Sequence, residues 1–411
     1  QGPNPVTHYF MYGLDEKKSP SPLFDPCFYS TTYDVDTADF FTHYCNHGMN
    51  QEHRPCEWFD PVFYRQRYVK DNVQKPLHHF LQEGMKKRYY PNRTIEQLIA
   101  KPVISVLVPV YNADPAQLNN CIRSVLYQSY PHWELCLADD CSTRPEIRPL
   151  LAKWAEKDDR IKVTFLEQNS GIAIATNNAA SLATGDYIGL LDNDDELSLD
   201  ALFHNVQAIN DNGGDLLYSD EDLIGTDGRQ YSIFRKPAFN DELLLCHNYV
   251  THFVVTKHSL FRQAGGFNSD FNGAQDLDLF LKLSELAEKI VHIPRVLYHW
   301  RASESSTSIH HEQKEYANEA GRKSVEKALE RRGINGEAQL TELKYYYRAK
   351  RYVSEDLSVT VVVNWNSSEV DIESWLSHLL ATAGHAVQHL VFVMAGNKIN
   401  KNKHKLAAKT N

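Results

Sequence analysis

The sequence predicts an α/β protein whose main domain is built on a doubly wound, mostly parallel β-sheet. Strand-like and helix-like segments alternate between residues 103 and 191, which is the pattern of consecutive βαβ units. The first strand-like run, residues 103–110, is apolar at nearly every position, and such runs are typical of strands buried on both faces. A run of acids at 192–195 ends the fourth strand and indicates where a site should lie.

Composition limits the class of protein. The chain has 411 residues, of which 42% are hydrophobic and 23% charged, as in soluble globular proteins of two or three domains. No apolar run approaches the roughly 20 residues of a membrane span, and residues 1–4 do not resemble the start of a signal peptide. The net charge of −10 argues against a general nucleic-acid binder. Seven cysteines without a disulfide framework or CxxC pair favour a reducing, cytoplasmic location.

The first hundred residues contain a repeat of about 35 residues. A Thr-His-Tyr motif followed by glycine at 7–13 recurs at 42–48 and, in weaker form, at 78–84. A Phe-Asp-Pro motif at 24–26 returns at 59–61. Such periods predict stacked helical units that share a core. A single histidine per unit beside aromatic residues is more typical of a packed, hydrogen-bonded side chain than of a metal ligand.

The central elements follow from hydrophobic spacing, and their alternation predicts a parallel sheet with right-handed crossovers. After them the pattern loosens, and residues 310–332 are predicted to form a charged helix ended by Gly333. The predicted central elements are strands at 103–110, 133–138, 161–166 and 187–191 and helices at 115–128, 147–156 and 172–183, with further strands at 216–219 and 251–256.

The last part of the chain restates the opening of the central domain. Residues 359–366 resemble the strand that ends at Asn112, and a helix at 372–380 and a strand at 389–394 follow before a basic tail. This region carries no acidic cluster of its own, so no chemistry is expected there. The predicted domains are a repeat region at 1–98, an α/β domain at 99–335, and a linker with the start of an incomplete second α/β domain at 336–411.

Polar loops follow four successive strands of the predicted sheet. They are Pro109–Asn112, Asp139–Asp140, Asn169–Gly171 and Asp192–Asp195. Each alone is typical of a turn, and an isolated Asp-x-Asp is more often a solvated turn than a site. Carboxyl ends of parallel strands, however, meet at the edge where open α/β sheets bind ligands. A divalent cation that binds a diphosphate would suit the aspartates of the fourth loop.

Residues 103–301 resemble inverting glycosyltransferases of family 2, which have the GT-A fold and use nucleotide sugars. In the segment that resembles the family's catalytic-base motif, Gln275 stands where glutamate is usual and Asp276 is retained. The repeat region before this segment and the second α/β region after it resemble parts of bacterial multidomain enzymes that build surface polysaccharides. The motifs that carry the resemblance are Val-Pro-Val-Tyr-Asn (108–112), Asp-Asp-Cys-Ser (139–142), Asn169-x-Gly171, Asn177, Gly-Asp-Tyr (185–187), Leu-Asp-Asn-Asp-Asp (191–195), the segment 273–279 and Val-Leu-Tyr-His-Trp-Arg (296–301).

The resemblance implies a single displacement that inverts the anomeric carbon, with Asp276 as the base that deprotonates the acceptor hydroxyl. It implies Mn²⁺ or Mg²⁺ held by Asp192, Asp194 and His299. Asp139 or Asp140 would bind the nucleotide base, and the sequence does not say which. The substrate-binding residues that the resemblance implies are Pro109, Tyr111, Asn112, Asp139, Asp140, Asn169, Gly171, Asn177, Asp192, Asn193 and Arg301.

The function implied is transfer of a sugar from a UDP- or dTDP-sugar to a hydroxyl of a growing bacterial surface polysaccharide such as O-antigen or capsule. The acceptor would be a glycan or a lipid-linked glycan, and the location the cytoplasm or the inner face of the cytoplasmic membrane. Gln275 supports an alternative, a catalytically weak nucleotide- or glycan-binding module of a larger assembly. A nicotinamide dehydrogenase is disfavoured because residues 112–115 are not a glycine-rich turn. The role of the repeats stays open: they could bind the acceptor, mediate oligomerisation, or dock to a partner enzyme or a membrane.

Overall fold

The protein is described by a computed structural model that covers residues 23–37, 39–70, 75–225, 228–301, 315–352, 359–365, 372–382 and 387–394. The chain divides into two compact units. The first holds residues 1–332 and 338–349, and the second holds 333–337 and 350–411. The first copy of the Thr-His-Tyr motif and the basic tail lie outside the described residues.

The N-terminal helices of the first unit come in two matching sets. Each set begins with a helix whose first residue is the proline of an Asp-Pro pair. The aspartate carboxylate accepts a hydrogen bond from the N–H three residues later and so caps the helix. Each then has a short α-helix that runs into one π-helical turn ending at glycine. The elements are α2 (Pro26–Thr32), α3 (Phe40–His43) and η2 (Tyr44–Gly48), then α4 (Pro61–Tyr68), α5 (Pro76–His79) and η3 (Phe80–Gly84), followed by α6 (Arg93–Glu96).

A buried tyrosine organises each set. The hydroxyl of Tyr29 lies 3.1 Å from Nδ1 of His43, and the hydroxyl of Tyr64 lies 2.9 Å from Nδ1 of His79. These histidines are therefore packed, hydrogen-bonded side chains, as their aromatic surroundings predicted. The repeat region also packs on the rest of the unit, since the Tyr90 hydroxyl lies 2.9 Å from Nε2 of His132.

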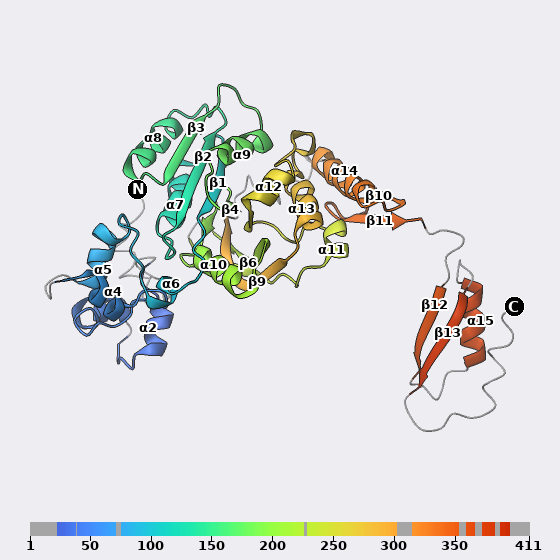
Figure 1. Cartoon of the computed structure of the whole chain (residues 1–411), viewed down its shortest axis with the longest axis horizontal. Helices are drawn as coiled ribbons and strands as arrows, with labels where there is room; N and C mark the ends of the chain where they lie inside the picture. Colours follow the sequence, from blue (N-terminus) through green and yellow to red (C-terminus); the bar gives the residue numbers. More distant parts are fainter. Residues whose placement is uncertain are drawn as a thin grey trace. The chain divides into compact units, whose positions relative to one another are not determined.

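The predicted βαβαβαβ series is present in the first half of the main sheet (Figure 1). Its four strands are parallel and lie in the order β3-β2-β1-β4. Both β1 and β2 are buried along their whole length, as their apolar runs predicted. The elements are β1 (Ile104–Val110), α7 (Pro115–Leu126), β2 (Trp133–Asp139), α8 (Ile147–Lys157), β3 (Ile161–Phe165), α9 (Ile172–Ser181) and β4 (Tyr187–Leu190).

The second half of the sheet is mixed, which sequence spacing did not reveal. β8 (Val254–Lys257) lies between β4 and β6 (Leu216–Ile224) and is antiparallel to both. β9 (Ile290–Arg301) runs parallel to β6, and β5 (Glu196–Leu197) and β7 (Gln230–Phe234) pair antiparallel with β9 and β6. The helices of this half are α10 (Ala201–Asn212), α11 (Asp241–Cys246), α12 (His258–Gln263), η4 (Ser269–Phe271), α13 (Gln275–Leu286) and α14 (Glu315–Arg331).

One apolar core underlies the sheet and its first helices. On α7, the helical spacing predicted from sequence buries Leu118, Ile122 and Val125 completely. That helix begins where the Asp114 carboxylate accepts hydrogen bonds from the first free N–H groups. The carboxyl ends of β1, β2 and β4 are thereby fixed at one edge of a rigid layer, which is where the polar loops leave.

The remaining elements are small. β10 (Gly336–Leu340) and β11 (Tyr347–Arg351) pair as a two-stranded sheet. In the second unit, β12 (Val359–Trp365) and β13 (Val387–Met394) are parallel and joined through α15 (Ile372–Thr382), so the predicted strand–helix–strand order is present. Among the residues described, no helix is both long enough and apolar enough to cross a bilayer.

Candidate functional site

The acidic loop after β4 is held from several elements. Nδ2 of Asn193 donates to the carbonyl of Pro109 at 2.8 Å, which ties this loop to the end of β1. The buried Asp195 accepts hydrogen bonds from the Tyr298 hydroxyl and from the N–H of Arg301. The side chain of Arg301 also donates to the loop, through Nε to the carbonyl of Asp194 at 2.7 Å and through a terminal nitrogen to Glu196. Asn193 and Arg301 were predicted to bind substrate. In the structure, their side chains hold the loop in place.

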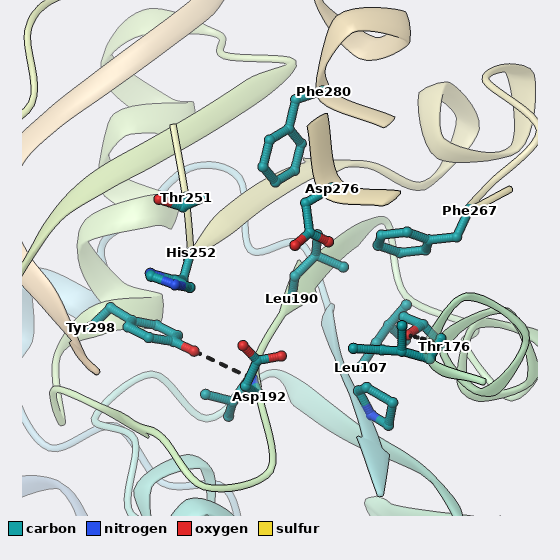
Figure 2. A pocket seen from close by; sticks show the side chains of 13 residues that line it. Leu107, Thr176, Leu190, Asp192, Thr251, His252, Phe267, Asp276, Phe280 and Tyr298 are labelled. Atoms are coloured by element: carbon teal, nitrogen blue, oxygen red, sulfur yellow. Dashed lines mark hydrogen bonds between the residues drawn. The ribbon is translucent and has the colours of Figure 1, made fainter. Parts of the chain in front are cut away.

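Asp192 and Asp276 face one pocket from opposite walls. Asp192 follows β4, whereas Asp276 is the second residue of α13, and Figure 2 shows the two carboxylates projecting toward the same space. His252 and Tyr298 form a third wall. The other walls are mostly apolar and include Leu107, Pro109, Ile172, Leu190, Phe267 and Phe280. Two predicted residues that lie far apart in the sequence, Asp192 and Asp276, are therefore brought together.

Burial makes both carboxylates unusual acids. It raises the pKa of Asp192 to about 7, with repulsion from Asp276 and Asp194 adding to the effect and the charge of His252 opposing it. Burial likewise raises the pKa of Asp276 and of Asp194. Within the described residues, no hydrogen-bond donor reaches an oxygen of the Asp192 carboxylate. The site therefore favours a positive charge or a proton beside these groups.

His252 supplies one such charge and was not predicted. Its Nδ1 lies 3.1 Å from Oε2 of Glu221, and its ring stacks on Tyr298 with centroids 5.3 Å apart. Burial alone would lower the pKa of His252, but Glu221, together with Asp195 and Asp192, raises it to about 9. A histidine whose charged form is favoured thus lies beside the two pocket carboxylates. The only sequence signal for it was the acidic run at 220–222, whose partners lie elsewhere in the sequence, between Lys236 and His299.

Those three consecutive acids of β6 are buried, and each is paired with a basic side chain. Each has a histidine partner, and the middle one also has a lysine. The pairs are Asp220–His292 at 2.7 Å, Glu221–His252 at 3.1 Å, Glu221–Lys236 at 2.7 Å and Asp222–His299 at 2.7 Å. Buried charges are tolerated when they are paired in this way. We call residues 220–222 the β6 acid row.

The predicted metal ligands are brought together only in part. His299 directs Nδ1 to Asp222 at 2.7 Å and does not line the pocket. In the part of the chain that the structure describes, no three His, Cys, Asp or Glu side chains are grouped so that they could hold a metal, so the predicted set of Asp192, Asp194 and His299 is not assembled. The carboxylate oxygens of Asp192 and Asp194 do match the hard oxygen ligands that Mn²⁺ and Mg²⁺ take.

The structure distinguishes the two aspartates at the end of β2. The carboxylate of Asp140 is occupied by hydrogen bonds from the loop at 169–171. It accepts them from Nδ2 of Asn169 at 2.9 Å and from the N–H groups of Ser170 and Gly171 at 2.7 and 2.8 Å. Gly171 has φ of +88°, a conformation that favours glycine. Among the residues that the structure describes, one donor reaches the Asp139 carboxylate, the N–H of Ser142 at 3.2 Å. The loop at 169–171 is thus shaped by Asp140, and Asp139 is the less committed of the pair.

Two predicted asparagines serve neighbouring backbone. Oδ1 of Asn112 accepts from the N–H groups of residues 143–144 at 2.8 and 3.0 Å. Asn177 donates to the carbonyl of Phe267 and accepts from its N–H, which fixes an aromatic wall of the pocket. Tyr111 is 48% exposed at the end of β1 and remains free to pack on a ligand.

Comparison with known proteins assigns the chain to a family. Residues 105–265 match the family described as Glycosyl transferase family 2. An uncharacterised protein of Sinorhizobium fredii is 44% identical over 62% of this chain and 28% of its own length. The O-antigen biosynthesis protein RfbC of Myxococcus xanthus is 33% identical over 70% of this chain and 22% of its own length. The putative colanic acid biosynthesis glycosyl transferase WcaA of Escherichia coli is 30% identical over 47% of this chain and 73% of its own length.

These matches define the class of the protein as a glycosyltransferase. The chain belongs to glycosyl transferase family 2, which confirms the resemblance seen in its motifs. It spans about a quarter of the length of the first two relatives. The crystal structure of TarS residues 1–349 from S. aureus in complex with UDP-GlcNAc has a TM-score of 0.46 and 22% identity, covering 55% of this chain and 66% of that one. Membership rests on the sequence matches.

Proposed function

We propose that this chain transfers a sugar, with inversion, from a nucleotide sugar to a hydroxyl of a growing bacterial surface polysaccharide. The observation that carries the proposal is the pair of carboxylates, Asp192 and Asp276, that face each other across one pocket. One would serve the leaving diphosphate and the other the incoming hydroxyl. Relatives named for O-antigen and colanic acid biosynthesis support the class of acceptor.

Asp276 acts as the general base. Its carboxylate is next to Phe280 and Phe267 in a largely apolar pocket, and burial raises its pKa. A carboxylate of raised pKa removes a proton from a sugar hydroxyl more readily than one in water. The hydroxyl oxygen then attacks the anomeric carbon on the face opposite the diphosphate, the bond to the diphosphate breaks, and the configuration inverts.

Asp192 and Asp194 would hold Mn²⁺ or Mg²⁺, which when bound supplies positive charge beside the diphosphate. Asp139 accepts a hydrogen bond from an N–H of the nucleotide base, and Tyr111 packs on that base; a uracil or thymine of a UDP- or dTDP-sugar offers such an N–H. The acceptor is a glycan or a lipid-linked glycan at the cytoplasmic side of the membrane.

The alternative of a catalytically weak binding module is less well supported by the local geometry. Gln275 accepts a hydrogen bond from the N–H of Gly273 at 2.7 Å and is 7% exposed. It therefore stabilises the turn before α13, while its neighbour Asp276 lines the pocket. Glutamine at this position does not remove the candidate base.

The test uses a panel of radiolabelled UDP-, dTDP- and GDP-sugars with Mn²⁺ and Mg²⁺ in the buffer. Wild-type protein should release nucleotide and label a polysaccharide acceptor, while Asp276→Asn and Asp194→Ala should each lose at least about 100-fold in turnover. Asp270→Asn, at an exposed aspartate of η4, is the matched control and should retain wild-type turnover. Wild-type turnover in both site variants would overturn the assignment, and saturable nucleotide-sugar binding without any turnover would favour the binding module.

A further inference from the structure

His252 is the one basic side chain on the pocket wall among the described residues, and its two ring nitrogens face different surroundings. Nδ1 is bonded to Glu221, so Nε2 is on the far side of the ring. In Figure 2 the ring lies beside the space between Asp192 and Asp276. Within the described part of the chain, Nε2 has no hydrogen-bond partner.

The need to pair Glu221 does not by itself account for the presence of His252 at this position. Nζ of Lys236 already lies 2.7 Å from Oε2 of Glu221, and both side chains are nearly buried. The Glu221 carboxylate thus already has a lysine partner, so the β6 acid row does not need His252 for pairing. The ring of His252 instead lines the pocket, where two carboxylates and a sugar would meet.

The other pairs of the row show what a purely structural histidine looks like here. His292 bonds Asp220 through Nε2 at 2.7 Å and stacks on Tyr218 with centroids 5.0 Å apart. It contributes nothing to the pocket wall. His252 likewise bonds an acid of the row and stacks on a tyrosine, but its ring also lines the pocket, and among the described residues nothing bonds its Nε2.

We propose that His252 is a substrate-binding residue of the transfer site, whose Nε2–H donates to a hydroxyl or acetamido oxygen of a sugar lying between Asp192 and Asp276. Glu221 fixes the ring through Nδ1, and Tyr298 supports its face, so the donor is presented in one orientation. The inference rests on the proposed function, since it assigns a further contact within the same site. The bound sugar is that of the donor or that of the acceptor.

Two variants separate the two nitrogens. His252→Asn places an amide N–H near the position of Nδ1, so it keeps the bond to Glu221 and removes the Nε2 donor. His252→Gln places an amide N–H near Nε2 and gives up the bond to Glu221. His292→Asn is the matched control, because it breaks an acid–histidine pair of the same row that does not reach the pocket.

The readouts are Kd for the free nucleotide, Kd for the sugar nucleotide that gives turnover in the donor screen, kcat, and KM for each substrate. Loss of one hydrogen bond to the sugar predicts a fall of about 10-fold in kcat/KM for His252→Asn. We expect His252→Gln to recover at least part of that loss, despite lower stability, and His292→Asn to keep wild-type kcat/KM.

The pattern of constants identifies which sugar is bound. Weaker binding of the sugar nucleotide with unchanged binding of the free nucleotide places the donor sugar on His252, whereas a change confined to the acceptor's kcat/KM places the acceptor there. If His252→Asn has wild-type constants, or if His292→Asn loses as much as it does, the inference is wrong although the proposed function stands. If wild-type protein turns over no donor, the proposed function fails and this inference fails with it.

Discussion

Two acidic runs of the main sheet, the loop at 192–195 and the β6 acid row at 220–222, are treated in opposite ways by the fold. In the row, every acid has a basic partner within 3.1 Å. Burial acts to raise the pKa of Glu221, but His252 and Lys236 bring it below its ordinary value. In the loop, Asp195 is hydrogen-bonded, yet burial raises the pKa of Asp192 to about 7.

The presence or absence of internal partners separates acids that stabilise the fold from acids that are available to a ligand. A buried carboxylate with internal partners is already paired, and removing it leaves those partners unpaired. A buried carboxylate without them costs folding free energy, and that cost is recovered when a cation, a proton or a sugar hydroxyl reaches it. Proximity in sequence of several aspartates does not distinguish the two cases, whereas the partners do.

The largest expected effect is on stability in the β6 acid row. Glu221→Gln removes the charge that faces both Lys236 and His252 and should lower the free energy of unfolding by about 3–5 kcal/mol. Urea denaturation followed by circular dichroism measures it. The same chemical change at Asp192 is the control, and we expect no loss there. Equal losses at both positions would remove the distinction between the two runs.

The next effect is on turnover. Asp192→Asn should lower kcat by about 100-fold or more, which is roughly 2.7 kcal/mol in the barrier, while the free energy of unfolding stays equal or rises because a costly buried charge is gone. Steady-state kinetics and urea denaturation on one preparation give both numbers. A variant that is fully active, or one that is inactive only because it is unfolded, would contradict the prediction.

The two runs should also respond to pH with opposite sign. The folded pKa of Asp192 is about 7 against an ordinary 3.8, so this group makes the protein less stable as pH rises from about 4 to 7. The pKa of Glu221 is lowered from 4.5, so its contribution is present above that value and is lost as pH falls below it. Neither slope exceeds about 1.4 kcal/mol per pH unit.

The pH measurement compares wild type with each variant by thermal unfolding at constant ionic strength. The difference between wild type and Asp192→Asn should grow in favour of the variant up to about pH 7, and the difference from Glu221→Gln should shrink in acid. Parallel curves for all three proteins would show that neither carboxyl has a shifted pKa in the folded state.

The smallest effect is expected for an ion pair that the fold leaves in water. Arg88 and Asp159 lie 3.3 Å apart, with side chains 48% and 85% exposed. Arg88→Ala should change the free energy of unfolding by no more than about 0.5 kcal/mol and lose nothing further in 0.5 M salt. A loss comparable with that of Glu221→Gln would mean that burial is not what gives the acid row its importance.

The sequence allowed one half of the sheet to be predicted well. β1 and β2 are buried throughout, so their composition alone identified them, and parallel strands necessarily bring Asp139 and Asp192 to one edge. The antiparallel entry of β8 between β4 and β6 has no such signature. Because β8 and the residues before it bring His252 to Glu221, that contact could not be foreseen.

The roles of individual motif residues were also beyond the sequence. Asn177 and Arg301 are polar and lie in motifs, yet their donors are directed to backbone carbonyls of Phe267 and Asp194. Whether a polar side chain meets backbone or ligand depends on distances of a few ångströms that residue order does not encode. Asp276, in contrast, lines the pocket, and its role as the base stays a prediction.

In the repeat region, the tyrosine hydroxyl of each unit lies where a side chain on the unit's last glycine would begin, Tyr29 over Gly48 and Tyr64 over Gly84. The same hydroxyls bond the histidines His43 and His79. Tyrosine, histidine and glycine therefore form one interlocked triplet in each unit, and changing the glycine alone displaces the tyrosine from its histidine. Further units of this kind can be sought in other chains by the spacing of that triplet, without reference to the residues between.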